Sequence, residues 1–381
     1  MENQENCSTP VMTTETAGCA AVLKKKLSDE TSKKIAAIRI ILMILVVFAH
    51  NNYNELALPS GGAVFNQSVF GKWVQLLISD GLARGAVPVF FTISAFLLYY
   101  KKTPYPVVLK KKAKSIFLPF ILWPVVNMLF FAAVKFIADV AHIGFLDGVG
   151  NYDFLTWTPK EWFSNFFGYG GDGILYLSHF WFLRDLIILT IISPVLSLLY
   201  DKAKVLYVAA IIYIEFVGVF TYFIMPESLF YFSVGMIWAK SDFDIFELAG
   251  KIKWYEIIPV FLGLWFIFWK FQRFPVTTVT LMAFADFLML MKFSQILIKN
   301  EKVYNALVYF STYSFFLYAV HIKILRAIIR TVWIKVLPMT NGFFCLAEYF
   351  GVTILMIASG IGLGILLKKI CPPLFNILNG R

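Results

Sequence analysis

The chain has 381 residues, of which 59% are hydrophobic and 15% are charged. Ordinary soluble domains are about 45 to 50% apolar and about 25% charged, so this composition excludes a soluble globular protein and indicates a polytopic membrane protein. The formal net charge of +11 is not evidence for nucleic-acid binding, because most of the excess lysine lies in short connections beside apolar runs, where it sets insertion orientation.

The first 34 residues are polar and end in several lysines. No short apolar core followed by a small-residue cleavage site marks a secretory signal. We therefore expect a cytoplasmic N-terminal tail over 1–34, a transmembrane domain over 35–370 and a cytoplasmic C-terminal tail over 371–381.

The apolar runs have the length of membrane-spanning helices, which need about 20 apolar residues each. An outer-membrane barrel would instead show roughly ten-residue alternating segments. The sequence predicts an all-α bundle of about ten spans with both termini in the cytoplasm, because most of the 34 lysines and arginines then lie in inner segments. The predicted spans are 35–52, 84–100, 115–138, 180–200, 204–222, 226–240, 255–272, 275–293, 303–322 and 343–367; the short 226–240 segment leaves nine or eleven spans open.

The first predicted span contains an ionisable side chain at each end of the run RIILMILVVFAH, Arg39 and His50. Eleven residues are close to three helical turns, so both side chains face one direction, roughly 16 Å apart. A charge facing lipid costs at least about 2.5 kcal/mol, which favours a protein interior or a wet cavity for this face. Taken singly, each residue is equally well explained as a snorkelling arginine or an interfacial histidine; as a pair they favour a function.

The run KKKAKSIFLPF (110–120) places Lys111 and Lys114 at the cytoplasmic end of the third predicted span. Their spacing lets both face the same way on a helix. They are able to bind the phosphates of a soluble donor, although charge alone favours an anchor beside anionic lipid.

The longest outer connection, 139–179, contains a helix start at Thr158, Pro159 and Glu161. These residues have the spacing of a capping box with proline at the first helical position. The aromatic residues that follow predict a short amphipathic helix on the membrane surface. We favour an anchoring role for it over a role as one wall of a substrate cleft.

The segment SHFWFLRDL places His179 and Trp181 at the outer boundary of the fourth predicted span, and Arg184 and Asp185 inside it. Charges inside a membrane need partners. Adjacent helical positions point about 100° apart, so we expect Arg184 and Asp185 to find different partners.

Three further ionisable residues lie in or beside predicted spans. Glu215 and Asp286 are intramembrane acids, and either is a candidate to orient His50 or to neutralise Arg39. His321 ends the ninth predicted span, and a structural role is favoured over a catalytic one. The four cysteines lack metal-ligand spacing, so no metal is expected.

Taken in order, these motifs resemble the acyltransferase 3 family of integral-membrane O-acyltransferases, which modify extracytoplasmic glycans. The resemblance covers about residues 35–370. The segments that carry it are the Arg39 and His50 pair, AVPVFFTISAFLLYY (86–100) with Ser94, KKKAKSIFLPF (110–120), HFWFLRDL (179–186) and YSFFLYAVH (313–321). Two departures from the family pattern are Ala95, where a glycine is expected after Ser94, and lysines in place of the two arginines of the R-x-x-R element.

The resemblance implies transfer of an acyl group, most often acetyl, from cytoplasmic acyl-CoA to a glycan or lipid-linked sugar, in a bacterial cytoplasmic membrane. His50 is then the general base, and Arg39, also placed in the catalytic site, holds donor charge or steadies the channel. The residues expected to bind substrates are Lys111, Lys114, Ser94, His179, Trp181, Arg184, Asp185 and His321. Direct transfer and an acyl-histidine intermediate both fit.

Two other classes of function remain open at this stage. One is a transporter or flippase without covalent chemistry, because intramembrane charges also mark substrate pathways. Such a protein is often built from two similar halves, and no such self-similarity is evident here. The other is a catalytically silent membrane scaffold, which would leave the intramembrane charges without an explanation.

Overall fold

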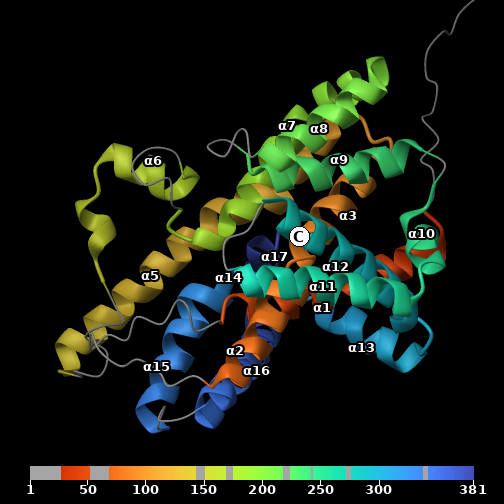
Figure 1. Cartoon of the computed structure of the whole chain (residues 1–381). Coiled ribbons are helices and arrows are strands. Elements are labelled where there is room, and N and C mark those ends of the chain that lie inside the picture. Colours follow the sequence, from red (N-terminus) through yellow and green to blue (C-terminus); the bar gives the residue numbers. More distant parts are fainter. Residues whose placement is uncertain are drawn as a thin grey trace, which may run out of the picture.

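The computed structural model describes residues 27–51, 68–142, 151–168, 175–217, 224–241, 243–271, 276–337 and 342–381. All regular elements in these ranges are helices (Figure 1). They are α1 (Asp29–Ala49), α2 (Val69–Gln75), α3 (Ala86–Tyr100), α4 (Tyr105–Lys112), α5 (Leu118–Ala141), α6 (Pro159–Phe167), α7 (Trp181–Lys202), α8 (Lys204–Val217), α9 (Pro226–Lys240), α10 (Ile245–Lys251), α11 (Trp254–Phe271), α12 (Val276–Leu297), α13 (Glu301–Ser311), α14 (Ser314–Val320), α15 (Ala327–Val336), α16 (Gly342–Ile370) and α17 (Pro372–Leu378). The expected all-α membrane bundle is confirmed.

Several of these helices join into continuous segments with the length of a membrane span. Among the described residues, five are long and apolar enough to cross a membrane: Val69–Tyr100, Tyr105–Ala141, Ser178–Lys202, Thr277–Leu297 and Gly342–Ile370. The pair α10 and α11, bent by 94°, adds a sixth if it forms one span. The count of ten spans and the orientation of the termini stay predictions.

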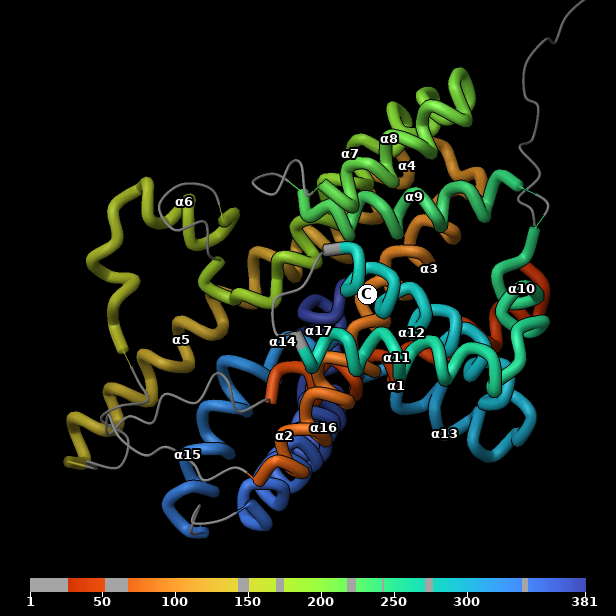
Figure 2. Tube along the Cα trace, in the orientation of Figure 1, coloured from red at the N-terminus to blue at the C-terminus, as the bar shows by residue number. Residues whose placement is uncertain are grey.

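Helix α1 lies at the centre of the bundle and contacts α3, α12, α13, α14 and α16 (Figure 2). It begins at Asp29, before the expected residue 35, because the Ser28 side chain caps it by accepting a hydrogen bond from the Thr31 amide at 3.1 Å. Most of its apolar side chains are buried, including Ile38 and Leu42 with no exposed surface. Among its charged side chains Lys34 is buried, whereas Lys33 and Arg39 are exposed.

The expected ninth span, 303–322, is not one continuous helix. The chain forms α13, breaks at Thr312 and Tyr313, and resumes as α14, which passes directly into the π-helical segment η6 (His321–Arg326). Both halves of the segment contact α1, and α14 also contacts α16. An apolar run alone does not reveal such a break, because residues on both sides of it are hydrophobic.

The amphipathic helix expected after Thr158 is α6, and its predicted capping box is present. The Thr158 hydroxyl accepts from the Glu161 amide at 3.3 Å, and the Glu161 carboxylate accepts from the Thr158 amide at 2.7 Å. These hydrogen bonds lower the pKa of the Glu161 carboxyl, so the cap is retained at neutral pH and is lost as the carboxylate is protonated in acid. Figure 1 shows α6 apart from the centre of the bundle, as an anchoring role requires.

Helices α3 and α9 pack closely because Gly235 of α9 has no side chain. A Cβ atom at this position would lie 2.1 Å from the carbonyl oxygen of Thr92 in α3. We expect Gly235→Ala to force the helices apart and to destabilise the fold by about 1 to 3 kcal/mol. Thermal unfolding in detergent measures the loss. The matched control is Gly263→Ala in α11, where an added Cβ meets nothing within 4 Å; equal melting temperatures for the two variants would contradict this account.

Candidate functional site

Two cavities lie along α1, one beside His50 at its C-terminal end and one beside Arg39 near its middle. The first, the histidine cavity, has a volume of about 300 Å³ and includes His50, His179 and Trp181 in its lining. The second, the lysine cavity, has a volume of about 450 Å³ and is lined by residues that include Arg39 and Lys111. Both ionisable side chains of the first predicted span thus face cavities inside the protein.

The two cavities share five lining residues, which form a wall common to both. Residues common to both linings are Phe90, Phe182, Leu183, Ser314 and Phe315. They come from α3, α7 and α14, and four of the five are apolar. The histidine cavity and the lysine cavity therefore adjoin each other along these five side chains.

Three of the four histidines in the chain meet beside the histidine cavity. The ring of His50 lies 5.4 Å from the ring of His321, and the ring of His321 lies 5.0 Å from that of His179, measured between centroids. His179 is 3% exposed and His321 has no exposed surface. We call these three residues the histidine cluster.

Hydrogen bonds from Tyr318 and Arg326 hold the histidine cluster together. The Tyr318 hydroxyl donates to the His179 carbonyl oxygen at 2.5 Å. The Tyr318 carbonyl oxygen lies 2.7 Å from His321 Nδ1, and since a carbonyl only accepts, Nδ1 must carry the proton. Arg326 donates to the carbonyl oxygen of His50 and so fixes the end of α1 against η6.

The histidine cluster contains buried nitrogen atoms without protein partners in the described part of the chain. They are both ring nitrogens of His179 and Nε2 of His321. A buried polar group without a hydrogen bond costs about 1 to 3 kcal/mol. Such groups call for an explanation in function or in bound water, and here they lie beside a cavity.

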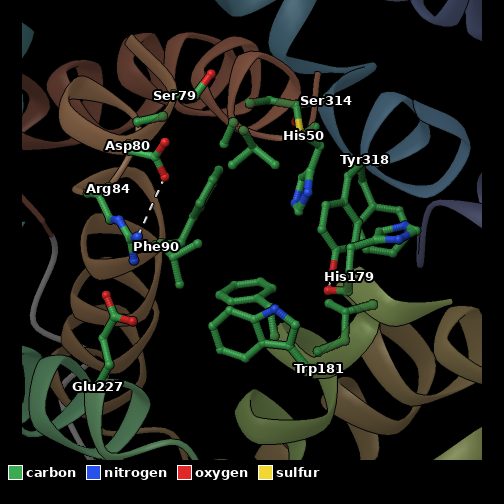
Figure 3. A pocket seen from close by; sticks show the side chains of 18 residues that line it. His50, Ser79, Asp80, Arg84, Phe90, His179, Trp181, Glu227, Ser314 and Tyr318 are labelled. Atoms are coloured by element: carbon green, nitrogen blue, oxygen red, sulfur yellow. Dashed lines mark hydrogen bonds and ion pairs between the residues drawn. The ribbon is translucent and has the colours of Figure 1, made fainter. Parts of the chain in front are cut away.

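Figure 3 shows the imidazole of His50 pointing into the open centre of the histidine cavity. Trp181 lies on one side of that space, and Asp80, Arg84 and Glu227 lie on the side away from His50. Sequence analysis missed these three residues. The only signal in the sequence is that they are ionisable and border predicted spans.

The lysine cavity is strongly cationic. Arg39, Lys101, Lys111 and Lys112 line it, and no Asp or Glu does so among the residues described. An adjoining groove of about 660 Å³ shares Lys111 with this cavity and adds Lys110 and Lys114 to the set. Such a concentration of positive charge attracts multiply charged anions such as phosphates. Ser94 also lies in the lysine cavity.

Three π-helical segments occur in the described residues, and each contributes to a cavity or to the histidine cluster. Segment η2 (Leu76–Leu82) carries Asp80, η3 (Ala113–Phe117) carries Lys114, and η6 begins at His321. π-Helical turns are rare and are frequent at functional sites. Their positions support the choice of these cavities.

The expectation that Arg184 and Asp185 find different partners is wrong. Arg184 Nε and Nη2 donate to Asp185 Oδ1 at 3.1 and 3.0 Å. The long arginine side chain folds back along its own helix, which overcomes the 100° offset. The other carboxylate oxygen of Asp185 accepts from Met225 N and Ser228 Oγ at 2.9 and 2.8 Å. Neither residue lines a described cavity, and the pair joins α7 to α9.

The two acids considered as partners of His50 or Arg39 lie elsewhere in the bundle. Glu215 accepts a hydrogen bond from Thr280 at 3.0 Å, and Asp286 accepts one from the Gly85 amide at 2.7 Å. Neither lines the described cavities. The carboxylates that do line the histidine cavity are Asp80 and Glu227.

No metal site accompanies the cavities in the described residues, which contain no group of three or more His, Cys, Asp or Glu able to hold a metal ion.

Comparison with known proteins covers the whole membrane region. Residues 33–376 match the model of an acyltransferase domain, the acyltransferase 3 family. The chain is also similar to the succinoglycan biosynthesis protein ExoH of Rhizobium meliloti (strain 1021), with 26% identity over 369 residues, 92% of each chain. No solved structure matches. The matched region contains both cavities and the histidine cluster.

Proposed function

The chain belongs to the acyltransferase 3 family, and from that premise we propose that it moves an acyl group, in the first instance acetyl, from acyl-CoA to a hydroxyl of an extracytoplasmic or lipid-linked glycan. The observation that carries this proposal is the pair of cavities with a shared wall, one cationic and one bordered by histidines. The similar ExoH protein, named for succinoglycan biosynthesis, supports a polysaccharide as the acceptor.

The lysine cavity suits the nucleotide end of the donor. CoA carries several phosphates, and Arg39, Lys111 and Lys112 present cations to the cavity without a carboxylate among its described lining residues. Lysine binds phosphate as a point charge, whereas arginine can form two parallel hydrogen bonds to it. Lysines in place of the two arginines of the family pattern therefore reduce geometric selectivity for a phosphate but still attract it. The excess of basic residues in the expected inner segments supports a cytoplasmic position for the lysine cavity. We accordingly place the protein in the bacterial inner membrane.

The pantetheine arm would pass from the lysine cavity across the shared wall to bring the thioester to His50. The wall is formed mainly by apolar side chains such as Phe90 and Phe315. An uncharged, flexible arm crosses such a layer at far lower cost than a phosphate does. The layer thus separates the anionic end of the donor from the reacting end.

In the direct route, His50 removes the proton of the acceptor hydroxyl as its oxygen attacks the thioester carbonyl. The carbon–sulfur bond breaks, and the CoA sulfur leaves and takes up the proton from the imidazolium. The unperturbed pKa of histidine, about 6.5, suits a base at neutral pH. In the alternative route, the His50 ring nitrogen attacks the thioester carbonyl, the carbon–sulfur bond breaks, and the CoA sulfur leaves with the proton of the ring. The sugar hydroxyl oxygen then attacks the acyl group, the nitrogen–acyl bond breaks, and the hydroxyl proton returns to the imidazole. Both routes conserve one acyl group and one proton.

His321 and His179 act as positioning residues in this proposal. The Tyr318 carbonyl holds the proton of His321 on Nδ1 and leaves Nε2 as an acceptor. His321 thereby presents a fixed tautomer to the neighbouring His50 ring, 5.4 Å away between centroids. His179 contacts His321 from the far side. A neutral neighbour of this kind orients a base without adding a charge that would oppose its protonation.

The proposal is tested with the full-length protein in vesicles, given labelled acetyl-CoA and a panel of neutral and acidic oligosaccharides. Formation of an alkali-labile labelled ester on one of the sugars is the expected result. Movement of sugar across the vesicle membrane without ester formation would support the transporter instead. A second short acyl-CoA, such as succinyl-CoA, is included so that a donor preference other than acetyl is detected.

A further inference from the structure

The side of the histidine cavity away from His50 is polar and has no part in the chemistry derived above. Figure 3 shows Asp80, Arg84 and Glu227 grouped there. Asp80 belongs to η2, Arg84 lies in the turn before α3, and Glu227 is in the first turn of α9. We call these three residues the polar wall. They come from two separate parts of the chain and converge on one cavity.

One carboxyl group of the polar wall, that of Glu227, has no partner in the described part of the chain. Arg84 Nη2 lies 3.6 Å from Asp80 Oδ1, which is longer than a good hydrogen bond. Glu227 has no hydrogen-bond or ion-pair partner in the described part of the chain, and Arg84 reaches it only through a longer-range electrostatic attraction. An ionised carboxylate offers about four acceptor sites and no donor. A ligand rich in hydroxyl donors is the complement.

A second observation points to a ligand in the same cavity. His179 also lines it, is 3% exposed, and keeps both ring nitrogens without a partner among the described residues. Aromatic side chains, among them Trp181 and Tyr318, supply much of the remaining lining. Apolar and aromatic walls with a few converging polar groups are typical of small-ligand sites.

The charge of the polar wall restricts the ligand. With both carboxyl groups ionised, two carboxylates and one guanidinium give the polar wall one net negative charge. An anionic sugar placed between Asp80 and Glu227 would meet like charges in a partly desolvated site, which is costly. A neutral sugar instead donates its hydroxyls to these carboxylates. The volume of about 300 Å³ is at the small end of the range for ligand pockets, roughly 300 to 1,000 Å³, and fits one sugar unit.

We propose that Asp80, Arg84 and Glu227 form the acceptor subsite and that it selects a neutral hexose unit over a uronate, holding one hydroxyl toward His50. This inference rests on the proposed function, because it takes the acceptor to be a glycan. It adds the residues that bind the acceptor and the charge class of the sugar that enters. Arg84 limits the repulsion between the two carboxylates and orients them.

The test measures binding and turnover separately on the full-length protein in detergent. The probes are a labelled neutral hexose oligosaccharide and a matched oligosaccharide with a uronic acid at one position. Equilibrium dialysis gives Kd for each probe, and ester formation from acetyl-CoA gives KM and kcat. We expect wild-type protein to bind the neutral probe at least about tenfold more tightly, because one unfavourable charge contact is worth that factor or more.

Glu227→Gln is the first variant, since it removes the charge and keeps the shape. We expect Kd and KM for the neutral probe to rise about tenfold, the effect of losing one charge-assisted hydrogen bond, with a smaller change in kcat. The ratio of uronate to neutral Kd should fall, because the wall loses its excess charge. Arg84→Gln should move this ratio in the opposite direction, which loss of folding would not do.

Glu247→Gln is the matched control, because Glu247 is exposed and pairs with Lys251 outside the described cavities. It should leave Kd, KM and kcat unchanged. Unaltered Kd in Glu227→Gln, or equal wild-type affinity for the two probes, would overturn the inference. Binding with this selectivity but no ester from any acyl-CoA tested would uphold the subsite and reject the proposed transfer. Melting temperatures of each variant confirm that folded protein is compared.

Discussion

Replacing His50 by alanine is expected to lower ester formation by about 10² to 10⁴-fold, the usual contribution of a general base. His50 is the cluster member whose ring points into the open histidine cavity (Figure 3). Its loss removes the group that takes the hydroxyl proton in direct transfer, and also the nitrogen that would carry the acyl group in the two-step route. Initial rates with saturating labelled acetyl-CoA measure the effect.

The chain offers a matched control in its fourth histidine. His142 ends α5 in an exposed position and lines no described cavity. His142→Ala should keep the wild-type rate. Added imidazole should partly restore activity to His50→Ala if the residue acts as a base, because the cavity left behind is open to small molecules. A His50→Ala protein that is folded and retains the full rate would remove His50 from the chemistry.

Reversing the charge of Lys111 is expected to raise KM for acyl-CoA by at least about tenfold. Lys111 is the one lysine that lines both the lysine cavity and the adjoining groove among the described residues. Lys111→Glu replaces attraction to a phosphate by repulsion at the same place, and each 1.4 kcal/mol of lost binding is a factor of ten. The loss should shrink at high ionic strength, because salt screens exposed charges.

A truncated donor distinguishes phosphate binding from general damage to the site. S-acetylpantetheine has the thioester and the arm but lacks the nucleotide phosphates, so Lys111→Glu and wild type should use it equally. Lys160→Glu, on exposed α6 away from both cavities, is the charge-matched control and should behave as wild type with either donor. An equal loss with both donors would show that Lys111 does not act through the phosphates.

Local sequence patterns predicted the secondary structure well, because helix formation depends on near neighbours. The capping box at Thr158 and Glu161 requires only four consecutive residues, and it forms as expected. The failures occur where tertiary contacts override local periodicity. The broken segment between α13 and α14 and the pairing of Arg184 with Asp185 are of this kind. A rule about side-chain direction does not account for how far a flexible arginine can bend.

The sequence identified only some of the residues of the candidate site. His50, His179 and His321 were each identified as candidates, but a structural role was favoured for His321. Nothing in the chain indicates that residues separated by more than 100 positions share one cluster. Asp80 and Glu227 were not identified because acids beside the ends of predicted spans are common, and only their position on a cavity wall makes them unusual.

The sequence by itself determined that this is a helical membrane protein and placed Arg39 and His50 on one side of one helix. Both conclusions follow from apolar content and from the fixed pitch of the α-helix, which are properties of the chain within a few turns. Only the tertiary structure decided that three histidines meet, that two cavities share one wall, and which carboxylates enter the reaction space. Those facts depend on how distant helices pack against each other, and helical pitch carries no information about a neighbouring helix.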